Sequence, residues 1–108
     1  DTVEGFIRIA QTPDVEGRTY NIGTGQEISV GQLADRIVQI IGEDIPVLFD
    51  PTRIRPPASE VSRLICNSQR ARRDLGWQPT VPLEEGLRRT IEWIGDNLAS
   101  YRPDVYNI

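Results

Sequence analysis

The sequence lacks two residue types on which much enzyme chemistry depends. None of its 108 residues is histidine or lysine, and all twelve basic residues are arginine. Without histidine the usual general base at neutral pH and the commonest metal ligand are missing. Without lysine there can be no Schiff base, no P-loop lysine and no Tyr-Lys acid–base pair. These absences favour a binding function over a complete catalytic site.

Cysteine and methionine are also scarce. Cys66 is the only cysteine, which excludes an intrachain disulfide and a Cys-x-x-Cys site. Methionine is absent, so we expect that Asp1 is not a natural start and that the chain is a fragment or a processed product. No apolar run approaches the length of a membrane span, and no signal-peptide pattern occurs. We therefore expect a soluble, cytoplasmic protein that does not associate with membranes.

The net charge of −4 is spread unevenly along the chain. Residues 1–50 hold nine acidic residues and three arginines, a net charge of −6, whereas residues 51–80 hold two acidic residues and six arginines, a net charge of +4. Nucleic-acid binding needs a broad basic surface, which an acidic chain does not offer. A basic segment within an acidic chain instead suits a small phosphorylated ligand.

Hydrophobic spacing and turn residues predict one α+β domain over residues 1–108, with about four helices and two or three short strands. The expected helices lie near 3–10, 30–41, 69–75 and 83–98, and the expected strands near 18–22, 45–49 and 63–66. Ser29 and Gln32 are spaced as a capping box, and Gly42 and Gly76 are placed to end helices. Two or three strands are seldom stable on their own. We therefore expect the domain to dock on a larger body.

Several side chains have an expected structural role. Trp77 and Trp93 are interpreted as core anchors and Cys66 as a small buried hydrophobe. Ser68 is the expected N-cap of the helix over residues 69–75. Three arginines of that helix are expected to form an exposed face: Arg70, Arg72 and Arg73.

Four stretches resemble one known family. Residues 20–25 read Tyr-Asn-Ile-Gly-Thr-Gly, residues 55–64 read Arg-Pro-Pro-Ala-Ser-Glu-Val-Ser-Arg-Leu, residues 75–79 read Leu-Gly-Trp-Gln-Pro, and residues 83–93 read Leu-Glu-Glu-Gly-Leu-Arg-Arg-Thr-Ile-Glu-Trp. Together they resemble the C-terminal, substrate-binding part of the extended short-chain dehydrogenase/reductases, the family of NAD-dependent nucleotide-sugar epimerases and 4,6-dehydratases. The tail over residues 101–108 resembles the subgroup of UDP-N-acetylglucosamine 4,6-dehydratases of legionaminic-acid type.

The resemblance implies a nucleotide-sugar ligand, with a UDP-sugar expected, and an intact enzyme that is a homodimeric lyase. Such an enzyme oxidises the sugar C4 hydroxyl with bound NAD, eliminates water across C5–C6 and returns the hydride to C6. The family's glycine-rich dinucleotide loop, Tyr-x-x-x-Lys pair and catalytic carboxylates would precede Asp1. Gly23-Thr24-Gly25 lacks the third glycine of that loop. We therefore expect no catalytic residue, cofactor site or metal site here, and an inactive chain.

Arg55 is the first candidate for ligand binding. A diphosphate suits a planar, permanently charged group that donates two parallel hydrogen bonds. By resemblance, the arginine of the Arg-Pro pair touches the nucleotide diphosphate. Pro56 and Pro57 restrict the loop, which lowers the entropy lost when the side chain is held. The alternative is a solvated loop arginine.

Glu60 and Val30 are the other two candidates for substrate binding. The Glu60 carboxylate is suited to accept hydrogen bonds from ribose hydroxyls, and its alternative role is an ion pair with Arg55 or Arg63. Val30 matches a position that contacts the base in related epimerases, and its alternative role is an ordinary core residue.

The sequence leaves the reaction open. The same domain would serve a 4,6-dehydratase, a 4-epimerase or a related oxidoreductase, because these differ in residues outside this chain. An alternative from another functional class is a protein-interaction module whose basic loop binds an acidic partner.

Overall fold

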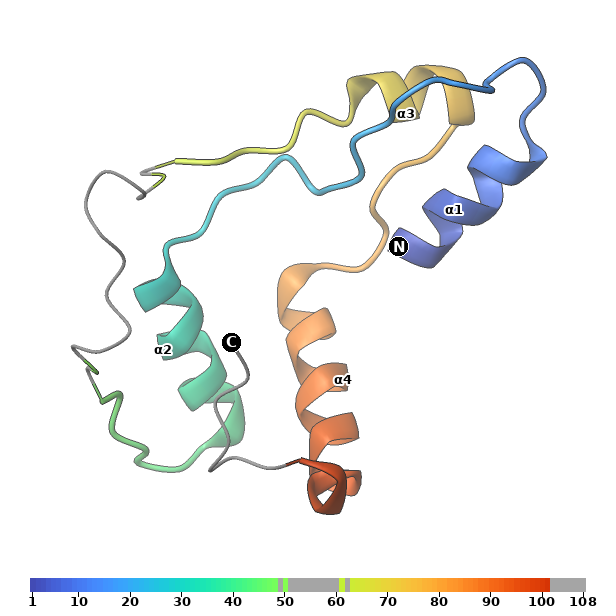
Figure 1. Cartoon of the computed structure of the whole chain (residues 1–108). Helices are drawn as coiled ribbons and strands as arrows, with labels where there is room; N and C mark the ends of the chain where they lie inside the picture. The colour runs from blue at the N-terminus through green and yellow to red at the C-terminus, as the bar shows by residue number, and fades with distance from the viewer. Residues whose placement is uncertain (49, 51–60, 62, 102–108) are drawn as a thin grey trace.

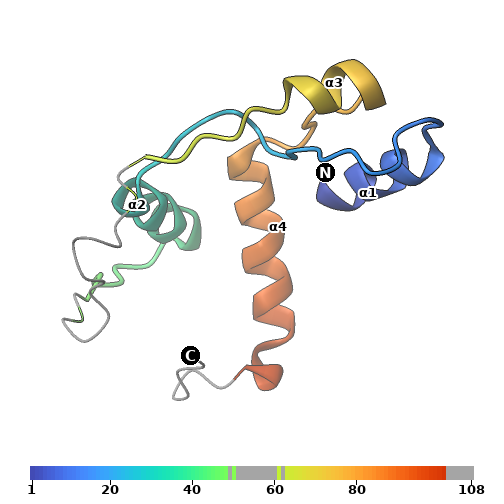
Figure 2. The same ribbon diagram turned by 45° about the horizontal axis from the view of Figure 1, so that its top comes forward.

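A computed structural model describes residues 1–48, 50, 61 and 63–101. Its elements are α1 (Thr2–Gln11), α2 (Val30–Ile41), α3 (Gln69–Leu75), α4 (Leu83–Asp96) and a 3-10 turn, η3 (Leu98–Ser100). Figure 1 shows α1 and α3 together at one end of the molecule, and α2 beside α4 at the other. The segment that leads into α2 and the segment that leads into α3 run side by side between the two ends, as Figure 2 also shows. The predicted number of helices is confirmed within the described residues.

The boundaries of α2 follow from local chemistry. The Ser29 hydroxyl accepts a hydrogen bond from the Gln32 amide at 3.1 Å, and the Gln32 side chain accepts one from the Ser29 amide at 3.1 Å. This reciprocal pair is the predicted capping box. At the other end Gly42 adopts a left-handed conformation with φ 76°, which favours glycine and ends the helix.

The short helix α3 also ends as predicted but begins differently. Gly76 closes it in a left-handed conformation with φ 60°. The side chain of Ser68 makes no capping hydrogen bond, so the cap predicted there is wrong in its chemistry. Asn67 supplies the oxygen instead, which accepts from the Gln69 amide at 3.0 Å.

The last helix, α4, carries ion pairs along its exposed side. Glu84 pairs with Arg88 at 2.8 Å and Glu85 with Arg89 at 2.7 Å, both one turn apart on the exposed side. Such pairs stabilise a helix by about 0.2–0.5 kcal/mol each. On its inner side α4 packs against α2. None of the helices among the described residues has the length and apolar character needed to cross a bilayer.

The predicted strands are absent from the described residues. Residues 18–22, 45–48 and 63–66 form no strand, and Phe49, the end of the second predicted strand, lies outside the described residues. A strand is defined by a ladder of backbone hydrogen bonds with a neighbour. Segments 18–22 and 63–66 run side by side (Figures 1 and 2), but no backbone hydrogen bond among the described residues joins them. The sequence spacing thus predicted that these segments are extended, but it could not show that they lack a hydrogen-bonded neighbouring strand among the described residues.

The core is small and lies at the α1–α3 end. It consists of Val15, Ala71, Leu75 and Trp77, whose exposed fractions run from 0% for Ala71 to 7% for Val15. Trp77, 2% exposed, confirms its predicted role. Trp93 does not: it is 57% exposed and meets the Tyr101 ring edge-on, with 6.2 Å between ring centroids.

The overall shape is open. The radius of gyration is 17.6 Å and the principal extents are 49 × 38 × 24 Å. A compact domain of about 100 residues has a radius of gyration of about 13 Å. Because the two ends share no common core, many apolar side chains remain exposed, Trp93 among them. This shape agrees with a domain that docks on a larger body.

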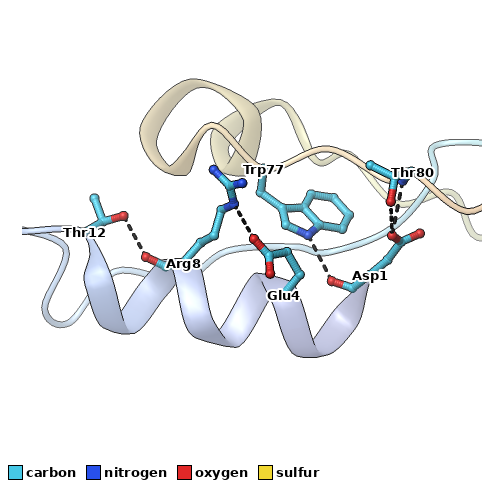
Figure 3. Close-up of polar contacts among 6 residues, drawn as sticks. All are labelled: Asp1, Glu4, Arg8, Thr12, Trp77 and Thr80. Carbon is cyan, nitrogen blue, oxygen red and sulfur yellow. Dashed lines mark hydrogen bonds and ion pairs between the residues drawn. The ribbon is translucent and has the colours of Figure 1, made fainter.

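Asp1 fixes the start of α1 to the segment between α3 and α4 (Figure 3). One of its carboxylate oxygens accepts from the Thr80 amide at 3.2 Å and from the Thr80 hydroxyl at 2.8 Å, and the other accepts from the Val81 amide at 3.1 Å. Its backbone carbonyl accepts from Trp77 Nε1 at 3.0 Å. The same carbonyl also accepts from the Gly5 amide at 3.0 Å, so five hydrogen bonds converge on Asp1, a residue for which the sequence indicated no such role.

The two extended segments lie close together at Gly23. A Cβ at this position would lie 2.7 Å from the Cys66 Cβ and 2.8 Å from its Sγ. Cys66 itself is only partly buried, so its prediction as a buried hydrophobe holds only in part. The close approach explains why a residue without a side chain stands here.

Replacing Gly23 by alanine is therefore expected to destabilise the fold by about 1–3 kcal/mol, because overpacking forces neighbours to move. Gly95 in α4 is the matched control, since an added Cβ there meets nothing within 4 Å. Gly95→Ala is expected to stabilise by about 0.5–1 kcal/mol through helix propensity. Urea unfolding followed by far-UV circular dichroism measures both. A Gly23→Ala variant as stable as the wild type would contradict the close packing.

Candidate functional site

A groove lies between the start of α2 and the segment that returns toward α3. Its volume is about 730 Å³. The residues that line it come from both sides: Gln26, Glu27, Ile28, Ser29, Val30 and Gln32 from the first, and Val61, Arg63 and Leu64 from the second. The α2 capping box fixes the first side, because it sets where the chain turns from extended to helical.

Apolar side chains on both sides of the groove are open to solvent. Val30 is 86% exposed, Leu64 87% and Val61 68%. Single exposed apolar side chains are ordinary, but three in one groove, with polar groups around them, are typical of a ligand site. The arrangement suits a flat ring with an apolar face and a polar edge.

An ion pair joins the two sides of the groove. Arg63 Nε lies 2.6 Å from one carboxylate oxygen of Glu27, and Arg63 Nη2 lies 2.7 Å from the other. This bidentate geometry is the strongest form of an arginine–carboxylate contact. The hydrogen bonds that the guanidinium donates to Glu27 raise the pKa of Arg63. The pair connects residues 36 positions apart, so no local sequence pattern indicated it.

Of the three predicted binding residues, one lies within the described part of the chain. Val30 lies on the groove, and its alternative reading as a core residue is wrong because the side chain is exposed. Arg55 and Glu60 lie outside the described residues. Val61, which follows Glu60 directly in the sequence, lines the groove. Of the two arginines proposed as partners of Glu60, Arg63 is paired with Glu27.

The arginines of α3 are exposed, as predicted, and none lines the groove. Arg70 donates to the Thr19 carbonyl at 3.2 Å, and Arg73 pairs with Asp74 at 2.6 Å. Hydrogen bonding from Arg73 lowers the pKa of the Asp74 carboxyl. Tyr20 donates to the same carboxylate at 3.3 Å, a contact between residues 54 positions apart.

The described residues do not fit a metal ion or a dinucleotide. Among them no three His, Cys, Asp or Glu side chains gather as metal ligands would. The Gly23-Thr24-Gly25 turn does not open a helix, and Gly23 faces the Cys66 side chain. A dinucleotide fingerprint instead places its glycines where a helix N-terminus receives the pyrophosphate. Cofactor chemistry is therefore not assigned to these residues.

Comparison with known proteins identifies the family. A sequence model of the family described as GDP-mannose 4,6-dehydratase matches residues 1–90. The dTDP-D-glucose 4,6-dehydratase of Mus musculus is 36% identical over 94% of this chain, which matches 29% of that relative. The UDP-glucose 4-epimerase of Mycolicibacterium smegmatis is 37% identical over 86% of this chain and 28% of its own length.

Two solved structures share the fold. A UDP-glucose 4-epimerase from Thermotoga maritima, crystallised with UDP-glucose, superimposes with a TM-score of 0.76 at 32% identity, over 90% of this chain and 29% of that one. A Bordetella bronchiseptica enzyme in complex with NAD+ and UDP gives a TM-score of 0.72 at 33% identity, over 92% of this chain and 28% of that one.

The chain spans about three tenths of the length of these relatives. The family model nevertheless covers most of the chain, and the structural likeness extends over nine tenths of it. The resemblance noted from the motifs is confirmed at this level: the chain belongs to the GDP-mannose 4,6-dehydratase family of extended short-chain dehydrogenase/reductases, which includes nucleotide-sugar 4,6-dehydratases and 4-epimerases.

Proposed function

We propose that residues 1–108 form the nucleotide-sugar-binding part of an NAD-dependent nucleotide-sugar 4,6-dehydratase. The observation that carries this proposal is the 36% identity with a dTDP-D-glucose 4,6-dehydratase over 94% of the chain. A relative this similar over nearly the whole chain supports a shared role for the matching part. The narrower assignment, a UDP-N-acetylglucosamine 4,6-dehydratase of legionaminic-acid type, rests on the tail motif alone and stays a prediction.

The groove supports a binding mode for the nucleotide. In this proposal the base lies against Val30 and Leu64, whose exposed apolar surfaces suit the face of a ring. Glu60 accepts hydrogen bonds from the ribose hydroxyls. Arg55 holds the diphosphate with its guanidinium fork. Burying the base between the apolar side chains on the two sides of the groove would stabilise the complex through the hydrophobic effect.

The chain's own part in the reaction is to hold the substrate. Its residues supply affinity for the nucleotide, and that binding energy positions the sugar for chemistry elsewhere in the enzyme. NAD binding and the catalytic side chains are assigned to a part of the enzyme outside these residues. The homodimer implied by the resemblance likewise stays a prediction.

A 4-epimerase is the second candidate. It is supported by the 37% identity with the Mycolicibacterium smegmatis enzyme and by the TM-score of 0.76 with the Thermotoga maritima epimerase. The two activities differ in their products, because a 4,6-dehydratase removes water from the sugar and an epimerase does not. Mass spectrometry of nucleotide sugars incubated with the complete protein and NAD distinguishes them.

Titration with UDP tests the binding role. We expect UDP to shift the methyl NMR signals of Val30 and Leu64 in the complete protein that carries this chain. The Ala71 methyl, which is fully buried on the inner side of α3, is the internal control, and its signal is expected to stay in place. Unchanged Val30 and Leu64 signals at millimolar UDP and UDP-sugar would contradict the proposal. Capture of an acidic protein under the same conditions would then favour the interaction module.

A further inference from the structure

The Arg63 guanidinium has one edge that the contact with Glu27 leaves free. A guanidinium has five N–H donors, one on Nε and two on each Nη atom. Glu27 uses one donor of Nε and one of Nη2. The other three lie on the edge that joins Nη1 and Nη2, and the described residues offer them no further acceptor. Because the side chain is 71% exposed, this edge is accessible to a ligand.

The free edge matches a phosphate group. Two neighbouring N–H groups of an arginine can donate in parallel to two oxygens of one phosphate. Both Glu27 oxygens lie on the Nε–Nη2 edge, so the same guanidinium can hold the carboxylate and a phosphate at once. Of the described residues that line the groove, Arg63 alone carries a positive charge. It is therefore the group in this lining that is suited to an anion.

The contact with Glu27 fixes the direction of the free edge. An arginine without a partner samples many rotamers, and a ligand that orders the side chain loses part of its binding free energy. The bidentate contact, at 2.6 and 2.7 Å, holds the guanidinium in one orientation before a ligand arrives. Glu27 stands two residues before Ser29, the N-cap of α2, so the capping box restrains the backbone close to the carboxylate.

We propose that Arg63 is a second diphosphate-binding residue of the groove and that Glu27 is the residue that positions it. The inference rests on the proposed function, because it adds two residues to the same nucleotide site. Arg55, the arginine already assigned to the diphosphate, belongs to the same basic segment of the sequence. A diphosphate has two phosphoryl groups, and each can accept from one arginine fork.

Glu27→Gln tests the positioning role, because its two effects on UDP binding have opposite signs. The substitution removes a negative charge from the groove, which by electrostatics alone strengthens the binding of an anion. It also removes the charged contact that orients Arg63, which weakens binding. We expect isothermal titration of the complete protein to show UDP affinity lowered about two- to ten-fold, the effect of one arginine side chain that must be ordered on binding. Unchanged or tighter binding of UDP overturns the inference.

Arg63→Ala tests the contact itself. We expect it to weaken UDP binding about ten-fold or more, the effect of losing hydrogen bonds between charged groups. Uridine, which lacks the diphosphate, is expected to bind the wild type and both single variants equally. If uridine and UDP lose affinity to the same extent, the groove has merely loosened and the inference is wrong.

The double variant shows whether Glu27 acts through Arg63. Once Arg63 is alanine, Glu27→Gln has no guanidinium left to position, so we expect it to cause no further loss of UDP affinity. A loss as large as in the wild-type background would mean that Glu27 acts by another route, which contradicts the inference.

Glu85→Gln is the matched control for Glu27→Gln. It breaks an arginine–carboxylate pair of similar length, Glu85 with Arg89 at 2.7 Å, on α4 and away from the groove lining. We expect UDP affinity to stay at the wild-type value, and a loss equal to that of Glu27→Gln overturns the inference. Far-UV circular dichroism checks that these variants, all at exposed positions, remain folded.

The outcomes separate the inference from the function on which it rests. A wild type that binds UDP, with unchanged affinity in Arg63→Ala, overturns the inference and leaves the proposed function standing. A wild type that binds neither UDP nor a UDP-sugar overturns both.

Discussion

Replacing Trp77 by alanine is expected to destabilise the protein by about 3–5 kcal/mol, the usual cost of deleting a buried tryptophan. The indole is 2% exposed and packs in the core cluster with Ala71, Leu75 and Val15. Its N–H also donates to the Asp1 carbonyl at 3.0 Å, so truncation removes a hydrogen bond as well as apolar contact. Stabilities of whole domains are about 5–15 kcal/mol, so the loss is a large part of the total.

Trp93→Ala is the matched control, with the same change of side chain on an exposed helix face. Because Trp93 is 57% exposed, its replacement is expected to cost about 1 kcal/mol, chiefly the edge-on contact with Tyr101. Urea unfolding of the complete protein, followed by circular dichroism, compares the two variants. Equal losses would contradict the placement of the core at the α1–α3 end.

The two tryptophans show how far the sequence predicts burial. Both were expected in the core, because a tryptophan side chain usually serves as an apolar anchor. Trp77 comes directly after a helix that ends at Gly76, where the chain turns back over Ala71 and Leu75. Trp93 lies on α4, which packs against α2, but its side chain remains 57% exposed and meets the Tyr101 ring edge-on. Helix periodicity gives the apolar side chains of a helix but not whether another element covers them.

Local features were predictable because their causes are local. The Ser29–Gln32 capping box and the glycine ends at Gly42 and Gly76 depend on residues within one helical turn. Contacts between distant residues were not predictable. Asp1 with Thr80 and Glu27 with Arg63 meet only because the whole chain brings them together. The strands failed for the same reason, since pairing depends on a partner that the spacing of one segment does not specify.

The candidate site, too, was predictable only in part. Val30 was identified because it matches a position that contacts the base in related epimerases, and the structure puts it on the groove. The neighbouring Glu27–Arg63 ion pair was not predicted, because no sequence pattern links two charged residues that are 36 positions apart. The predictions for Arg55 and Glu60 rest on residue type and resemblance alone, and they call for a direct measurement.

Arg55→Ala is expected to weaken UDP binding about ten- to a hundred-fold, because a hydrogen bond to a charged group contributes about 1.5–3 kcal/mol. Arg55→Lys is expected to recover only part of this loss, since an ammonium group keeps the charge but not the planar fork. Isothermal titration of the complete protein measures the dissociation constants. Uridine serves as the control ligand: it lacks the diphosphate, so its affinity is expected to be the same in wild type and variant.

A matched arginine separates a specific contact from a general effect of charge. Arg72 is exposed on α3, and no ion pair or hydrogen bond of its side chain occurs among the described residues. Arg72→Ala removes the same charge from the same basic segment, so an electrostatic effect on the segment as a whole would weaken UDP binding equally in both variants. A loss confined to Arg55→Ala, seen with UDP and not with uridine, places that guanidinium on the diphosphate. Equal losses, or none, would mean that Arg55 is a solvated loop arginine.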